Sequence, residues 1–196
     1  KSNGFKMKLI KAGNQISLFE VVSPLKFCGN PASSAQLLPL ELEERIENYW
    51  KARLRSKRSG EILTNARLIC LRSPDWENPL EVCNLSYKEW LFYINHRDCI
   101  EDQLFAVGLT GMLETKIGYI FGKRSHQVVG EANCYEFAPA GHLEPTDWNP
   151  QDQNFDFEGA LKREMEEELF IDPQALSITK TSMLAQDKKQ QIIDFC

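Results

Sequence analysis

The chain lacks the features that mark several classes of protein. No apolar run approaches the roughly 20 residues that a helix needs to cross a bilayer, and no secretory signal peptide is visible. There is no internal repeat and no low-complexity tract. The net charge of −5 argues against a general nucleic-acid binder. We therefore expect neither a membrane nor a nucleic acid as a partner.

Paired cysteine motifs are also missing, although cysteine itself is not. None of the six cysteines forms a C-x-x-C pair, and their spacing suits neither a zinc site nor a small disulfide framework. Most lie in apolar, strand-like runs, where buried reduced thiols are common. A reducing compartment is the simplest explanation, so the sequence predicts a cytoplasmic location. The cysteines are Cys28, Cys70, Cys83, Cys99, Cys134 and Cys196.

The composition is that of an ordinary globular protein, with 42% hydrophobic and 26% charged residues. A chain of 196 residues can bury one sizeable core, or one core with an accessory segment. Residues 1–38 predict one or two strands with loops. From Pro39 an apolar residue recurs at every fourth position, which predicts a helix to about Ser56. The basic end of this helix is typical of solvated surface, although it could attract phosphate. Its basic residues are Lys51, Arg53, Arg55, Lys57 and Arg58.

Further along the chain, apolar and β-branched runs predict strands around two more helices. A capping-box pattern at Ser86 predicts the start of the first of these helices. Two β-rich runs, residues 105–109 and 117–121, flank a turn and predict a hairpin or paired strands. The other predicted strands are residues 66–71, 80–85, 135–137, 176–184 and 192–195.

The most informative stretch is REMEEE, residues 163–168, where four carboxylates lie within five residues. On a helix, Glu164, Glu167 and Glu168 have the i, i+3, i+4 spacing that places side chains on one face. Like charges at this spacing repel by about 0.2–0.5 kcal/mol per pair, whereas Mg²⁺ prefers such oxygen ligands. A merely solvated acidic face is the alternative. The opposite face carries an apolar stripe of Phe157, Leu161, Met165 and Leu169.

A turn signal precedes this helix, because residues 138–145 read APAGHLEP. Together the turn and the helix resemble the signature of the Nudix hydrolases, in which a glycine loop leads to a helix with the order Arg-Glu-apolar-x-Glu-Glu. The match runs from Ala138 to Ile171. The matching positions are Gly141, Arg163, Glu164, Met165, Glu167, Glu168 and Ile171.

Two positions depart from the family pattern. Phe170 stands where the family has a glycine, and Phe155 stands where it has a glutamate, eight residues before Arg163. Asp156 or Glu158 is the expected substitute for that missing carboxylate.

The segment from Gly141 to Arg163 is also eight residues longer than the family pattern. Asp147 keeps the family count from the glycine, so we place the insertion within residues 148–155. Its polar residues and the Asn149-Pro150 pair predict an inserted, mobile loop.

The resemblance implies an α/β fold of the α+β type, the Nudix αβα sandwich with a mixed sheet and an N-terminal accessory region. Looser matches upstream are similar to a Nudix subgroup that includes UDP-glucose diphosphatases. We expect residues 1–100 to form an accessory region packed on the core, and residues 101–196 to form a Nudix domain without its C-terminal part. The upstream matches are Tyr49, Trp50, Arg53 and residues 107–111 and 121–125.

The resemblance also implies the roles of individual residues. Mg²⁺, or Mn²⁺ in its place, would be held by Glu164, Glu167, Glu168 and the backbone carbonyl of Ala140. Arg163 is expected to orient a glutamate, since its guanidinium is a fixed fork. Glu164 is the helix candidate for general base, and a residue of a later loop is the alternative.

Substrate contacts are expected upstream of the acidic helix. Lys123 and Arg124 follow a strand and could meet the diphosphate, or could be surface charge. Gly141 is expected to lie against the substrate. A lone histidine is more often structural, so His142 is not counted as a metal ligand. Aromatic residues at helical spacing could stack on a base but are more often core; they are Tyr87, Trp90 and Tyr93.

Three functions are consistent with these residues. The first is a Mg²⁺-dependent hydrolase that cleaves the diphosphate of a small nucleotide substrate, such as UDP-glucose, into UMP and sugar 1-phosphate. The second is an ADP-ribose or dinucleotide diphosphatase. The third is a non-catalytic Nudix-fold regulator that binds a nucleotide, which Phe170 and the long loop favour. Retention of mutually repelling glutamates opposes it, because a decayed site has no physical reason to keep them.

Overall fold

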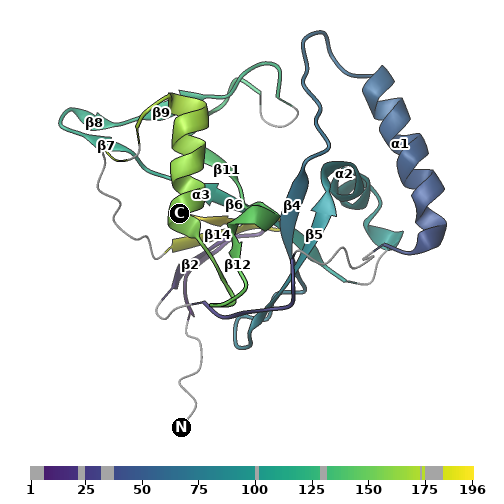
Figure 1. The fold of residues 1–196 in the computed structure, drawn as a ribbon, viewed down its shortest axis with the longest axis horizontal. Coiled ribbons are helices and arrows are strands. Elements are labelled where there is room, and N and C mark those ends of the chain that lie inside the picture. The colour runs from purple at the N-terminus through teal and green to yellow at the C-terminus, as the bar shows by residue number, and fades with distance from the viewer. Residues whose placement is uncertain are drawn as a thin grey trace.

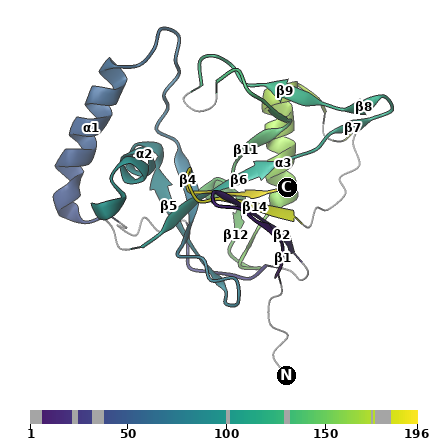
Figure 2. The ribbon, with the colours of Figure 1, turned by 180° about the vertical axis from the view of Figure 1, so that it is seen from behind.

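The computed structural model describes residues 7–21, 25–31, 38–99, 102–128, 132–172, 174 and 183–196. Within these ranges a large mixed sheet lies between helices, so the predicted mixed α/β class is confirmed. Helices α1 and α2 lie together beside β4 and β5, and α3 lies beside β9 and β11 (Figures 1 and 2). The helices are α1 (Glu43–Arg55), α2 (Tyr87–Asn95) and α3 (Phe157–Glu164).

The nine-stranded sheet has the order β1-β2-β14-β15-β6-β4-β5-β3, and β11 pairs with β6 beyond the end of β4. β6 runs parallel to β15 and antiparallel to β4 and β11, which makes the sheet mixed. The strands are β1 (Met7–Ala12), β2 (Ile16–Val21), β3 (Phe27–Cys28), β4 (Arg67–Arg72), β5 (Leu80–Ser86), β6 (Leu104–Thr110), β11 (Ala140–His142), β14 (Met183–Asp187) and β15 (Ile192–Phe195).

The two faces of the sheet bury separate clusters, because side chains alternate along each strand. Val107 and Leu109 of β6 belong to the cluster that includes Ala160 of α3. Leu104 and Ala106, the intervening residues, belong to the cluster formed with α1 and α2. The sheet is therefore the middle of three layers, with β6 at the centre of both clusters.

The helices α1 and α2, on the sheet face opposite α3, follow the sequence patterns. The predicted helix from Pro39 is confirmed as a short 3-10 turn, η1 (Leu40–Leu42), that continues into α1. Leu42 and Ile46 are buried on its inner side. The capping box of α2 is also confirmed, since both of its reciprocal hydrogen bonds are present.

The predicted pairing of residues 105–109 with residues 117–121 is wrong. β6 has hydrogen-bonded neighbours on both sides, so no edge is left for a hairpin partner. Residues 117–121 are divided between two ribbons, and Ile117 is fully exposed at the β7–β8 turn, where Gly118 has φ of 133°. The ribbons are β7 (Glu114–Thr115) with β8 (Gly118–Tyr119), and β9 (Phe121–Lys123) with β10 (Tyr135–Phe137).

The first hundred residues are built into the same sheet as the rest of the described chain. They supply β1–β5, so hydrogen bonding continues across the predicted domain boundary near residue 100. The predicted strand at residues 192–195 is confirmed as β15. The predicted strand at residues 176–184 falls mostly outside the described residues, and β14 begins at Met183.

Two expectations from composition can be compared with the described residues. None of their helices is long and apolar enough to cross a membrane. The cysteines whose side chains are described are unpaired thiols, and two of them, Cys70 and Cys83, are buried. The expectation of buried cysteines is therefore correct for Cys70 on β4 and Cys83 on β5. It is wrong for Cys28 and Cys134, which are exposed.

A buried carboxylate ties the end of α1 to the segment that follows it. Glu61 is 2% exposed and accepts hydrogen bonds from Arg53 at 2.7 Å and from Arg58 at 3.3 Å. The side-chain hydrogen bond from Arg53 is the main cause that lowers the pKa of Glu61 to about 2. Arg58 also donates to the carbonyl of Val128 at 3.0 Å. Arg53 and Arg58, two of the basic residues at the end of this helix, therefore form structural contacts with Glu61, and Arg58 also contacts Val128.

Replacing Glu61 by Gln is expected to lower the free energy of unfolding at neutral pH, because Arg53 then faces a neutral amide. The pKa of Glu61 is lowered from 4.5 to about 2, so its stabilisation is complete above this range and is lost as pH falls through it. Urea unfolding at about pH 6 and about pH 3 should therefore show a smaller difference between wild type and variant at the lower pH.

The control is Glu158→Gln, which removes an exposed ion pair with Lys162 on α3. It is expected to cost about 0.5 kcal/mol or less. A wild-type stability for Glu61→Gln, or an equal loss at both pH values, would contradict the prediction.

Candidate functional site

The acidic helix packs its apolar side on the sheet, as predicted. Asp156 caps its N-terminus and accepts the backbone N–H of Gly159 at 2.9 Å. Ala160 and Met165 are buried, and Leu161 packs against the same cluster. α3 then widens into a π-helical turn, η4 (Met165–Leu169), a rare element that occurs often at functional sites.

The π-turn changes the spacing that an α-helix would give to the glutamates. Glu164 is the last α-helical residue, and Glu167 and Glu168 lie in the wider turn. Glu164 and Glu167 line one cleft, whereas Glu168 lines its neighbour. The three glutamates therefore do not all line one cleft.

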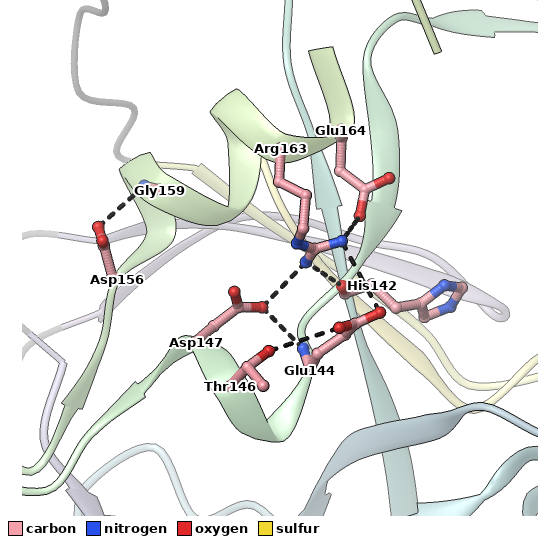
Figure 3. A network of polar contacts seen from close by, with 8 residues as sticks. All are labelled: His142, Glu144, Thr146, Asp147, Asp156, Gly159, Arg163 and Glu164. Carbon is pink, nitrogen blue, oxygen red and sulfur yellow. Dashed lines mark hydrogen bonds and ion pairs between the residues drawn. The ribbon is translucent and has the colours of Figure 1, made fainter. Parts of the chain in front are cut away.

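Arg163 is the centre of a network of carboxylates that joins α3 to the glycine loop (Figure 3). Its guanidinium donates to Glu164 at 2.6 Å and to Asp147 at 3.0 Å, and Glu144 lies 3.8 Å away. It also donates to the carbonyl of His142 at 3.4 Å. The expected contact of Arg163 with a glutamate is therefore present.

The expectation that Asp156 or Glu158 replaces the missing family glutamate is wrong. Asp156 caps the helix, and Glu158 pairs with Lys162 at 2.7 Å. Asp147 is the carboxylate that binds Arg163, and it stands at the family's position when counted from the glycine. The insertion lengthens the chain between Asp147 and Arg163 without moving them apart in space. Its two ends lie side by side, since the backbone N–H of Asp156 donates to the carbonyl of Asp147.

The insertion is a two-stranded hairpin and not an irregular loop. β12 (Trp148–Asn149) pairs with β13 (Asn154–Phe155), and the backbone N–H of Asp156 donates to the carbonyl of Asp147 at 2.8 Å. The rings of Trp148 and Phe155 meet at a centroid distance of 4.9 Å, and Phe155 is buried in the core. The apolar ends close the hairpin, so only its polar tip projects into solvent.

Glu164 and Gly141 fit together closely. Glu164 is 8% exposed, and a Cβ built on Gly141 would lie 2.1 Å from its carboxyl carbon. No side chain larger than hydrogen can stand at residue 141 while this carboxylate keeps its place. Burial raises the pKa of Glu164, and the charges of Glu167 and Glu168 raise it further, against the lowering effect of Arg163.

Glu168 meets the same backbone segment from the other side. Its carboxylate accepts the N–H of Ala140 at 2.9 Å. Partial burial raises the pKa of Glu168, and the nearby charge of Glu136 adds to this shift. Two of the predicted ligands, Glu164 and Glu168, therefore converge on residues 140–141, where the predicted carbonyl ligand Ala140 also lies.

The described part of the chain contains no preformed metal cage, because no group of three or more of its His, Cys, Asp or Glu side chains is arranged to hold a metal ion. Glu164 is turned towards Arg163, and Glu168 towards a backbone N–H. The donor set still fits Mg²⁺, because it consists of hard oxygens whose mutual repulsion a cation would relieve.

Two clefts open on either side of this loop, and they share part of their walls. The larger has a volume of about 680 Å³ and the smaller about 360 Å³. Glu168 lines the larger cleft, and Glu164 and Glu167 line the smaller one with Arg163. The residues common to both walls are Arg124, Val128, Gly141 and His142.

The predicted substrate-binding residues lie at these clefts. Lys123 lines the larger cleft, and Arg124 and Gly141 line both. Arg124 also pairs with Glu136 at 2.7 Å, so part of its charge is already compensated. Burial and the charge of Arg124 lower the pKa of His142 to about 4, which makes His142 a neutral wall residue at pH 7.

The aromatic residues of α2 divide between core and site. Trp90 and Tyr93 are buried, so their prediction as core is confirmed. Tyr87 is partly buried, packs against Trp50 and Trp90, and lines the smaller cleft. Sequence reasoning missed Asp187 and Asp194, which line the larger cleft from β14 and β15.

Phe170 has the backbone conformation that explains the glycine of the family pattern. It ends the π-turn in the left-handed region, with φ of 54° and ψ of 32°, and its side chain is 89% exposed. Glycine adopts this conformation without steric cost. The departure at Phe170 therefore changes the strain of the helix end and not the carboxylates of the site.

The comparisons with known proteins add no family assignment. A scan against protein-family models found none that matches the chain. A search of curated proteins gave no significant match. The Nudix resemblance consequently depends on the motif residues and on the arrangement just described.

Replacing Gly141 by Ala is expected to displace the Glu164 carboxylate, because the new Cβ would stand 2.1 Å from its carboxyl carbon. Titration with Mg²⁺ or Mn²⁺ should then show affinity reduced by about tenfold or more. The control is Gly122→Ala, whose Cβ would meet its nearest neighbour at an ordinary 3.4 Å. Equal metal affinity in Gly141→Ala and wild type would refute the convergence of ligands on this loop.

Phe170→Gly is expected to be more stable than Phe170→Ala by about 1 kcal/mol, since only glycine relieves the left-handed backbone. The comparison isolates the backbone, because both variants remove the same exposed ring. Urea unfolding of the two proteins measures the difference. An alanine variant as stable as the glycine variant would show that residue 170 is not held in this conformation.

Proposed function

We propose that this protein is a Mg²⁺-dependent hydrolase of the Nudix type that cleaves the diphosphate of a nucleoside diphosphate linked to a second group. A nucleotide sugar such as UDP-glucose is the preferred substrate, giving UMP and sugar 1-phosphate. The observation that carries the proposal is the meeting of two clefts at Gly141 and His142, where Glu164 and Glu168 approach the loop from its two sides. A diphosphate at this junction has room for one group on each side.

The cationic side chains of the junction suit the diphosphate. Arg124 lines both clefts and Lys123 lines the larger one, so phosphate oxygens can be met from the β9 side. A bound Mg²⁺ supplies the charge that offsets the developing negative charge on the phosphate oxygens. Tyr87 in the smaller cleft offers a flat ring to a nucleobase.

The carboxylates of the acidic helix have separate tasks in this proposal. Arg163, fixed by Asp147, orients Glu164 towards the junction. Glu164 serves as a metal ligand or accepts the proton of the attacking water, and burial makes it a stronger base than an exposed glutamate because its pKa is raised. Glu167 and Glu168 complete the negative charge that draws the cation to the loop.

Glu168→Gln is expected to lower turnover of UDP-glucose by about a hundredfold or more, because a charge that stabilises the metal sphere is removed. The matched control is Glu166→Gln, which removes an equal charge from an exposed residue of the same turn that lines neither cleft. Product analysis with Mg²⁺ and a panel of nucleotide sugars, ADP-ribose and dinucleotides measures both.

The same panel separates the alternatives. Cleavage of ADP-ribose or dinucleotides in preference to nucleotide sugars would favour the second hydrolase class. Tight binding of one panel member without cleavage would replace the enzyme by a nucleotide-binding regulator. An equal loss in Glu166→Gln and Glu168→Gln would remove the specific role of Glu168.

A further inference from the structure

The floor of the larger cleft is a face of the sheet that carries a row of three residues in register. Asp194 of β15 stands beside Gly108 of β6, and Gly108 stands beside His142 of β11. Residues in register point to the same face, and adjacent strands lie about 4.8 Å apart. Asp194 and His142 therefore flank Gly108, and both line the cleft.

Gly108 and Asp194 are fitted to each other. A Cβ built on Gly108 would lie 2.0 Å from an oxygen of Asp194, so the carboxyl group lies directly over the glycine backbone. Thr110, two residues along β6, lines the same cleft. An ionised carboxylate can accept about four hydrogen bonds in all.

The larger cleft has cationic side chains on the β9 side, Lys123 and Arg124, the second of which is paired with Glu136. Asp187 and Asp194 stand on the β14–β15 side. The carboxylate of Asp187 is engaged by Gln15 at 3.2 Å and by two backbone N–H groups of its own turn. Asp194 is thus the acidic side chain of this end that is presented to a ligand. A phosphate would be repelled there, and a neutral hydrogen-bond donor would be attracted.

The surroundings of Asp194 favour a ligand that brings donors. Burial raises the pKa of Asp194 to about 6, so the group is mostly ionised at neutral pH but poorly hydrated. A carboxylate in this position gains most from direct donors, because hydrogen bonds to charged groups are worth about 1.5–3 kcal/mol. Neighbouring hydroxyl groups of a sugar provide such donors without charge.

We propose that Asp194, which lies over Gly108, binds hydroxyl groups of the sugar and thereby selects nucleotide sugars over nucleotides that lack one. The inference rests on the proposed function: the sugar would occupy the larger cleft, and the diphosphate would lie at the junction of the clefts beside Gly141 and His142. It makes Asp194 a specificity-determining residue outside the acidic helix.

The test measures binding and does not require turnover. The probes are the methylene-diphosphonate analogues of UDP-glucose and of UDP, titrated calorimetrically with Mg²⁺ present. Asp194→Asn is expected to weaken binding of the glucose-bearing analogue by about tenfold or more while changing that of the UDP analogue by less than about twofold. Asp187→Asn, with the same change of charge at the same end, is expected to leave the ratio of the two affinities as in wild type.

Each other outcome overturns the proposal. An unchanged affinity ratio in Asp194→Asn shows that Asp194 does not bind the sugar. An equal loss for both analogues places the nucleoside at Asp194. If Asp194→Asn does not fold, Gly108→Ala decides, since its Cβ would overlap the Asp194 carboxylate, displace it and must lower the same ratio. Failure of wild type to bind either analogue overturns the proposed function as well, whereas normal binding and turnover with an unchanged ratio overturn this inference alone.

Discussion

The packing of one buried carboxylate on one glycine underlies the geometry of the site. Glu164 lies against the backbone of Gly141 and accepts a hydrogen bond from the guanidinium of Arg163. The same guanidinium also donates to Asp147. A buried charge is tolerated only when it is paired. The arginine therefore fixes both the end of α3 and the course of the glycine loop. Because the two clefts open beside this loop, their position depends on the same contact.

The central strand carries this arrangement into the rest of the fold. β6 contributes to both clusters of the core, and its final residues pair with β11, the strand that holds Ala140 and Gly141. β15 lies on the other side of β6 and brings Asp194 to the same face as His142. The absence of a side chain at Gly108 leaves room for the carboxyl group between them. A single buried strand thus positions the glycine loop and the floor of the larger cleft.

Much of the local structure follows from patterns within a few residues. The four-residue repeat after Pro39 and the capping box at Ser86 predicted two helices correctly, since each depends on contacts within one or two turns. The predicted pairing of residues 117–121 with residues 105–109 was wrong because strand pairing depends on contacts between residues distant in the sequence. Strand partners are chosen by burial and by free edges far away in the sequence, and a run of β-forming residues contains no record of either.

The sequence by itself determined the chemical content of the candidate site: a glycine loop, an arginine and three glutamates at motif spacing. Tertiary structure decided which carboxylate binds Arg163, because a hairpin of adjustable length returns Asp147 to the helix whatever its separation along the chain. It also decided that the acidic helix ends in a π-turn and that Glu167 and Glu168 line different clefts. Asp194 became visible only when β15 was placed beside β6, since parallel pairing joins strands that no local pattern connects.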